Sequence, residues 1–295
     1  MERVLITGCG GFIGKVLGDT LHKCGYEVSG ISKSDIKIKN INVYKADVCD
    51  KDIVGEICED KDIIIHLAAT TEHKNISKFP MESLWTSLSG TYNLLYAFQK
   101  SNAKNFIFPS SGKVYGKPSY LPFDEQHPLN PTTPLGRIKK LCEDMVLHFS
   151  TISDKSFSIL RIFNVYGPNQ KPEFLIPTIL SQIKNNKVIL GDIKSKRDYL
   201  YIKDLITAFL TIVKNKEKGV QIYNVGSGVS TSAEDIVRAI EKISKKKLSI
   251  EVDKSKLRKN EMPDEKADIS KLKILGWNPK YNVHSGLKDM FTNWE

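Results

Sequence analysis

The sequence predicts an α/β protein: a doubly wound parallel sheet with a smaller, discontinuous C-terminal domain. Three observations predict it. Short apolar runs alternate with helical stretches in the first half of the chain, a glycine-rich turn follows the first run, and the alternation breaks after Gly167-Pro168. Strands separated by helices of this length form parallel sheets that are covered on both faces. With 295 residues, the chain is long enough for two domains of ordinary size.

The individual elements follow in chain order from local patterns. Residues 62–66 contain Ile63-Ile64-Ile65, a β-branched run that favours a pleated strand. Leu84, Leu88 and Leu95 recur at helical spacing, so their helix has one apolar face. The same criteria predict strands at residues 3–6, 27–31, 43–47, 62–66 and 105–109, and helices at residues 14–24 and 84–100.

Domain boundaries are expected where these patterns change. Residues 169–200 contain a proline-punctuated helix and a short strand, residues 201–229 return to the sheet, and residues 230–295 are helical and charged. We expect a large domain of residues 1–168 plus about 201–229, and a smaller one of about 169–200 and 230–295. Ligands favour the cleft between two such domains and the carboxyl ends of parallel strands.

Composition excludes several classes of protein. The chain is 40% hydrophobic and 26% charged, which is typical of a soluble globular protein, and no apolar run approaches the roughly 20 residues of a membrane span. The net charge of +10 comes without a nucleic-acid motif or interleaved aromatic residues, so no nucleic-acid partner is expected. The five cysteines and six histidines lack metal-ligand spacing. We expect a cytoplasmic protein with reduced thiols and no metal.

The glycine-rich turn predicts a dinucleotide site in a Rossmann-type fold. Gly8, Gly11 and Gly14 form the pattern G-x-x-G-x-x-G between the first strand and the first helix. Such glycines permit a tight turn, bring backbone N–H groups close to a pyrophosphate, and let helix and strand pack closely. Asp47 ends the third predicted strand, where it could contact an adenine.

The end of the second predicted strand bears on the choice between NADP and NAD. A carboxylate about 20 residues after the glycines binds the ribose hydroxyls of NAD, whereas a basic residue accommodates the 2′-phosphate of NADP. The chain has Ser32-Lys33-Ser34-Asp35 here. Hydroxyls around a lysine favour NADP; a small shift of the chain that brings Asp35 to the ribose would favour NAD.

Several motifs together carry a family resemblance. The chain resembles an extended short-chain dehydrogenase/reductase of the NAD-dependent epimerase/dehydratase family, whose members modify nucleotide-activated sugars. The resemblance rests on Thr7 to Gly14, Ala46-Asp47, His66-Leu67-Ala68-Ala69, Ser110 to Gly116, Arg161 to Pro168, Arg197-Asp198-Tyr199, Tyr223 to Gly226, Asp268 to Lys271 and Leu275-Gly276-Trp277. It implies cofactor contacts at Gly8, Gly11, Phe12, Ile13, Gly14, Ser32, Lys33, Asp47, Val48, Leu67, Ala68, Ala69 and Lys139.

The resemblance also implies a catalytic set, and one member is missing. In the family a Ser or Thr, a Tyr and a Lys act together: the Tyr removes a proton from a sugar hydroxyl, and the Lys lowers the pKa of the Tyr. Ser111 and Lys139 match the first and last positions, but Leu135 stands where the family has tyrosine. Leucine cannot titrate, so ordinary dehydrogenase chemistry needs another proton acceptor.

Lys113 is one candidate for that role; a water held by Ser111 and Lys139 and the substrate's own groups are the others. Sugar 4,6-dehydratases of this family place an acid/base pair directly after the Ser/Thr, and in one branch the pair is Asp-Lys and the tyrosine is Met. The chain has Gly112-Lys113 at that pair. If Lys113 points into the cleft, burial could lower its pKa enough to make it a base. The alternative is a solvated lysine at a strand end.

The resemblance implies a nucleoside-diphosphate sugar as substrate. Asn164, Arg197, Tyr199 and Arg258 match family positions that hold the diphosphate and nucleoside, and arginine suits a bidentate phosphate contact. We expect an NAD(P)-dependent nucleotide-sugar epimerase or dehydratase. The alternatives are a 4-keto reductase and a catalytically degenerate family member that only binds the cofactor.

A homodimer is expected as well. Leu141, Met145 and Phe149 follow a helical period and resemble the family's helix pairs that build a four-helix dimer interface. A helix that faces the core is the plain alternative for these residues.

Overall fold

The computed structural model describes residues 1–69, 76, 78–257 and 262–292. The chain forms two compact units, each assembled from three segments. The first comprises Met1–Lys117, Pro128–Ile162 and Ile206–Tyr223, and the second comprises Pro118–His127, Phe163–Leu205 and Asn224–Glu295. The sequence patterns predict that the chain passes from one domain to the other near residues 168, 200 and 229. In the structure it does so after residues 162, 205 and 223, and the segment 118–127 also belongs to the second unit.

The first unit is built on a parallel sheet, as the sequence predicts. Its described strands are β1 (Arg3–Thr7), β2 (Glu27–Ser32), β3 (Asn42–Lys45), β4 (Ile63–His66), β5 (Asn105–Ser111), β6 (Ser156–Ile162) and β10 (Gly219–Val225), in the spatial order β10-β6-β5-β4-β1-β2-β3. The neighbouring pairs from β6 to β3 are all parallel. All four residues of β4 are buried, which explains its unbroken apolar pattern. The predicted fold class is confirmed.

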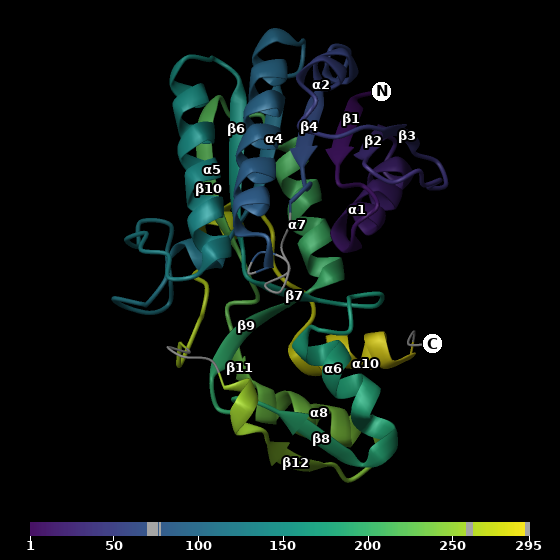
Figure 1. Cartoon of the computed structure of the whole chain (residues 1–295), viewed down its shortest axis with the longest axis vertical. Coiled ribbons are helices and arrows are strands. Elements are labelled where there is room, and N and C mark those ends of the chain that lie inside the picture. Colours follow the sequence, from purple (N-terminus) through teal and green to yellow (C-terminus); the bar gives the residue numbers. More distant parts are fainter. Residues whose placement is uncertain (70–75, 77, 258–261, 293–295) are drawn as a thin grey trace. The chain divides into compact units, whose positions relative to one another are not determined.

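Helices cover both faces of this sheet. They are α1 (Phe12–Lys23), α2 (Lys51–Cys58), α4 (Pro80–Lys100), α5 (Pro134–Thr151) and α7 (Ile202–Lys214). Figure 1 shows α2, α4 and α5 side by side. Leu5 belongs to the core cluster beneath them, whereas the next residue, Ile6, faces α1, since a side chain on Gly18 would come within 3.6 Å of its Cδ1. Within the described ranges, no helix is long and apolar enough to cross a membrane.

The second unit contains two small sheets. One has the order β11 (Ser230–Ser232), β9 (Lys196–Tyr201), β7 (Asn164–Tyr166), and the other pairs β8 (Lys187–Leu190) with β12 (Ser249–Val252). Its helices are α6 (Leu175–Gln182), α8 (Ala233–Ser244), α9 (Ser270–Ile274) and α10 (Val283–Thr292). Ser232 and Asp235 form a capping box that starts α8. β11 and β12 lie in the region that the sequence predicts to be helical.

Candidate active site

The turn between β1 and α1 has a geometry that requires glycine. Gly8 has φ +68°, a conformation that favours glycine, and a side chain there would come within 2.9 Å of the Ala68 nitrogen. A side chain on Gly14 would come within 2.5 Å of the Gly8 carbonyl oxygen. Because α1 begins at Phe12 directly after this turn, the unpaired N–H groups of its first turn form a cradle for an anion such as a pyrophosphate.

An ion pair lies at the ends of β2 and β3. Lys33 Nζ is 2.8 Å from Asp47 Oδ2, and Asp47 also accepts a hydrogen bond from the Cys49 N–H at 3.0 Å. Partial burial raises the pKa of Asp47, but the hydrogen bonds from Lys33 and Cys49 outweigh it and hold the pKa below its usual value. The structure therefore brings together two of the residues that the sequence predicts at the adenosine end of the cofactor.

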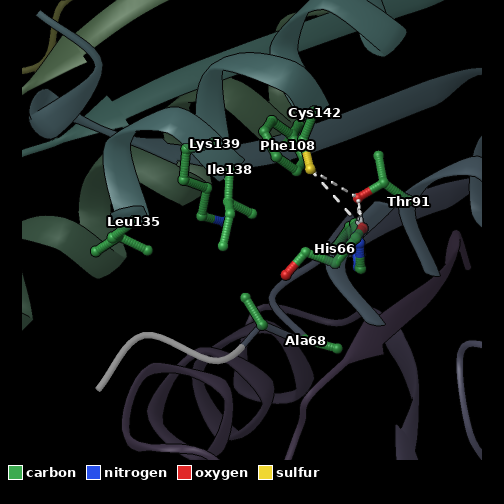
Figure 2. Close-up of a pocket in the computed structure, with 10 residues that line it drawn as sticks. His66, Ala68, Thr91, Phe108, Leu135, Ile138, Lys139 and Cys142 are labelled. Carbon is green, nitrogen blue, oxygen red and sulfur yellow. Dashed lines mark hydrogen bonds between the residues drawn. The ribbon is translucent and has the colours of Figure 1, made fainter. Parts of the chain in front are cut away.

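A pocket opens where the carboxyl end of β4 meets α4 and α5. Figure 2 shows Leu135, Ile138, Lys139 and Cys142 of α5 on one side of this pocket and His66 and Ala68 on the other. Ala69, Ser87, Thr91 and Phe108 complete its lining. Four residues that the sequence analysis selected for the cofactor or the chemistry therefore share one pocket: Ala68, Ala69, Leu135 and Lys139.

His66 links the glycine turn to this pocket through two threonines. Its Nδ1 is 2.8 Å from Thr7 Oγ1, which accepts a hydrogen bond from the Ala68 N–H, and its Nε2 is 3.1 Å from Thr91 Oγ1. Thr91 donates to the Ser87 carbonyl oxygen at 2.7 Å, so Nε2 of His66 is the donor to Thr91 and Nδ1 the acceptor from Thr7. Complete burial is the main cause that lowers the pKa of His66 to about 3. The ring is therefore neutral at physiological pH.

Lys139 is a buried amine one helical turn after Leu135. The side chain is 7% exposed, and its Nζ donates a hydrogen bond of 2.7 Å to the Pro109 carbonyl oxygen. The amine also lies 4.8 Å from the centroid of the Phe108 ring. Burial lowers the pKa of Lys139 below its ordinary value, while Cys142 and Glu143 oppose this shift more weakly.

Ser111 and Lys113 lie together at the end of β5. The Ser111 hydroxyl accepts the Lys113 N–H at 3.2 Å and so caps the short 3₁₀ helix η1 (Gly112–Val114). A side chain on Gly136 would come within 2.3 Å of the Lys113 carbonyl oxygen, so this turn packs tightly against the start of α5. Lys113 is partly buried, and the residues that line the pocket do not include it.

A buried ion pair that the sequence analysis missed lies behind these residues. Arg161 Nη2 donates to Glu143 Oε2 at 2.9 Å, and Arg161 Nη1 donates to the Tyr115 hydroxyl at 3.2 Å. Ser110 donates to the other oxygen of Glu143. The signal in the sequence was Arg161, a charged residue inside a short strand that is otherwise free of charge.

Three of the four predicted substrate residues lie on the paired strands β7 and β9 of the second unit. Asn164 Nδ2 donates to Glu265 Oε2 at 3.3 Å, and Arg197 Nε is 3.6 Å from the same oxygen. Arg197 also donates to the Met262 carbonyl oxygen at 2.7 Å. Tyr199 is paired with Asn164 in the register of β7 and β9, and Arg258 lies outside the described residues. Glu265, 3% exposed, is a member that the sequence analysis did not select.

The chain is similar to known proteins in sequence and in fold. A family model described as GDP-mannose 4,6 dehydratase matches residues 5–290. Human dTDP-D-glucose 4,6-dehydratase is 31% identical over 324 residues, with 100% of this chain and 92% of the human protein covered. GDP-6-deoxy-D-mannose reductase of Pseudomonas aeruginosa is 27% identical over 306 residues, with 100% and 97% covered. The structure of a UDP-glucuronic acid 4-epimerase from Bacillus cereus, in complex with UDP-glucuronic acid and NAD, matches with a TM-score of 0.89 at 26% identity, with 99% and 98% covered.

Proposed function

The chain belongs to the NAD-dependent nucleotide-sugar epimerase/dehydratase family of extended short-chain dehydrogenases, and from this premise we propose that it oxidises a ring hydroxyl of a nucleoside-diphosphate sugar. The observation that carries the proposal is the glycine cradle, which lies on the same unit as the pocket of Leu135 and Lys139. A single Cβ at Gly8 or Gly14 would fill this cradle. Without it, the cradle fits the pyrophosphate of a dinucleotide. When bound, the dinucleotide supplies the acceptor for a hydride from the sugar.

The residues of the chain supply orientation and proton transfer. The Ser111 oxygen already accepts the Lys113 N–H, which leaves its own proton to donate to the reacting sugar oxygen. Leu135 carries no titratable group, so the base is a lysine amine, from Lys113 or Lys139. The alternative function is binding of the cofactor without turnover of a sugar. Leu135 favours this alternative because it replaces the base that the family uses.

We assign the diphosphate and nucleoside to Asn164, Arg197, Tyr199 and Arg258. Support comes from the meeting of Asn164 and Arg197 at Glu265 and from the fork of donors that arginine presents to phosphate. Glu265 orients both side chains in this proposal. The UDP-glucuronic acid bound in the Bacillus cereus epimerase is a nucleotide sugar of this kind.

A preference for NADP over NAD is part of the proposal. Lys33 places an ammonium group at the end of β2, and the Ser32 hydroxyl there accepts the Ser34 N–H at 3.2 Å. Calorimetry should show tighter binding of NADP, and Lys33→Ala should remove the preference while leaving NAD affinity within about threefold, because a phosphate contact contributes only to the phosphorylated form. Lys23→Ala, on the exposed last turn of α1, is the control. Equal binding of both cofactors by the parent would contradict the preference.

We also propose a cytoplasmic homodimer. All five cysteines are free thiols, which persist in reducing compartments. The outer face of α4 leaves Met81, Trp85 and Tyr92 exposed, and α5 beside it exposes Leu141. Met145 and Phe149 pack on the core instead, so the apolar face available to a second copy consists mainly of α4 residues.

The turnover of a nucleotide sugar tests the function. Pure protein is incubated with UDP-, dTDP-, GDP- and CDP-hexoses and either cofactor, and products are identified by NMR. We expect conversion of one sugar to an epimer or a 4-keto product. If the parent converts none and Leu135→Tyr converts one, the chain is a binder that lost its base. If neither does, and no nucleoside diphosphate raises the melting temperature, the proposed function fails.

A further inference from the structure

Three titratable side chains line the pocket beside Leu135: His66, Lys139 and Cys142. His66 has both ring nitrogens within hydrogen-bond distance of threonine hydroxyls and a pKa of about 3, so it accepts no proton near neutral pH. Burial raises the pKa of the Cys142 thiol, which keeps it protonated, and its sulfur donates to the Ser87 carbonyl oxygen. Lys139 is the remaining candidate base of this lining.

The surroundings of Lys139 favour the neutral amine. The nearest carboxylate along α5 is Glu143, one turn further on, and Arg161 holds that carboxylate through a bond of 2.9 Å. Within the part of the chain that the structure describes, Lys139 forms no ion pair, and its hydrogen bond goes to the uncharged Pro109 carbonyl oxygen. An amine without a carboxylate partner in an apolar setting loses its proton more readily than one in water.

We propose that Lys139 is the base itself: its neutral amine takes the proton directly from the reacting sugar hydroxyl, instead of acidifying a tyrosine. The proposal rests on the proposed function. As the sugar alcohol becomes a ketone, the O–H bond breaks and a new N–H bond forms on Nζ, while the carbon-bound hydrogen leaves as hydride to the nicotinamide dinucleotide. The ammonium group returns the proton when the ketone is reduced again.

Leu135 is compatible with this role because it is shorter than tyrosine. It lines the same pocket one turn before Lys139, and it has no hydroxyl that could stand between the amine and the sugar hydroxyl. Lys113 does not line the pocket, and its backbone is held between the Ser111 hydroxyl and Gly136. The geometry therefore favours Lys139 over Lys113.

Chemical rescue by small amines tests the base directly. Lys139→Ala should lower kcat by at least about 10²-fold, the lower range for loss of a general base. Methylamine, ethylamine and aminoethyl derivatives of different basicity should then raise kcat of this variant at least about tenfold. The rescued rate should rise with the concentration of the unprotonated amine and should depend on the basicity of the amine that is added. A merely positioning lysine would not show this dependence. The matched control is Lys140→Ala, whose exposed side chain pairs with Asp144 on the same helix; it should keep kcat and show no rescue.

A second readout needs no turnover. ¹⁵N NMR of lysine-labelled protein, with Lys139→Met for assignment and thermal unfolding to confirm that the variant folds, reports the titration of the Lys139 amine. We expect it to titrate well below an ordinary lysine. An ordinary titration, or amine rescue in Lys113→Ala but not in Lys139→Ala, overturns the proposal. If the parent protein converts no nucleotide sugar but the Lys139 amine titrates below an ordinary lysine, only the proposed function is contradicted.

Discussion

At the scale of single residues, His66 makes stability depend on pH. Its pKa is about 3 in the fold against about 6.5 in an unfolded chain. Below pH 6.5 the unfolded state therefore binds the proton more readily, and the free energy of unfolding falls as the pH falls toward 3, by up to about 1.4 kcal/mol per pH unit. Urea unfolding at pH 7, 5.5 and 4.5 should show that His66→Gln has a shallower pH dependence than the parent, although it is less stable at pH 7.

Exposed His148 on α5 provides the matched control. His148→Gln should follow the pH dependence of the parent, because it leaves the buried His66 and its contacts intact. A His66→Gln variant with the same slope as the parent would show that burial does not hold the ring neutral in the fold.

The single residue that matters most for chemistry was readable from the sequence, but its environment was not. The family resemblance identified Leu135 and Lys139, which stand at the tyrosine and lysine positions of the family's motif. The burial of Lys139, and the pairing of Glu143 with Arg161, depend on how α5 packs against β5 and β6, and local patterns do not contain that information. The role of the lysine could therefore be argued only from the structure.

At the scale of elements, the β1–α1 turn tolerates no side chain at Gly14. A Cβ there would lie 2.5 Å from the Gly8 oxygen and 2.8 Å from the Cys9 Cα, both backbone atoms that cannot rotate away. Gly14→Ala should destabilise the protein by about 1–3 kcal/mol and weaken dinucleotide binding at least about tenfold, which is roughly 1.4 kcal/mol. Chemical denaturation and calorimetry measure the two effects.

Gly55 in α2 is the matched control for this prediction. Nothing lies within 4 Å of a Cβ built there, so Gly55→Ala should stabilise the helix by about 0.5–1 kcal/mol and leave cofactor binding unchanged. A Gly14→Ala variant that binds the dinucleotide as tightly as the parent would contradict the cradle.

The strands of the two units differ in how well the sequence predicts them. β4 is a buried β-branched run and was predicted to within one residue. β12 has no buried residue and pairs with β8 in a two-stranded sheet. Its four residues, Ser-Ile-Glu-Val, alternate polar and apolar side chains, but the run is too short to outweigh the helical pattern that precedes it. Its formation depends on the parallel register with Lys187–Leu190, which is a tertiary property.

At the scale of the whole molecule, the exposed apolar face of α4 predicts self-association. Met81 and Trp85 are 73% and 71% exposed, and Tyr92 lies two turns further along the same helix. Large apolar side chains grouped in this way mark an interaction surface, and a second copy of the same face buries them symmetrically.

Light scattering should therefore give a mass of about twice the 33.3 kDa chain. Trp85→Glu should reduce it to the mass of one chain, because a charge buried against apolar residues without a partner is costly. Ile274→Glu is the control, since Ile274 is 84% exposed on α9 in the second unit and should leave the dimer intact. If both variants have the melting temperature of the parent, misfolding is excluded as the cause of a change in mass. A parent of single-chain mass, or a Trp85→Glu variant that remains a dimer, would show that two copies do not associate through α4.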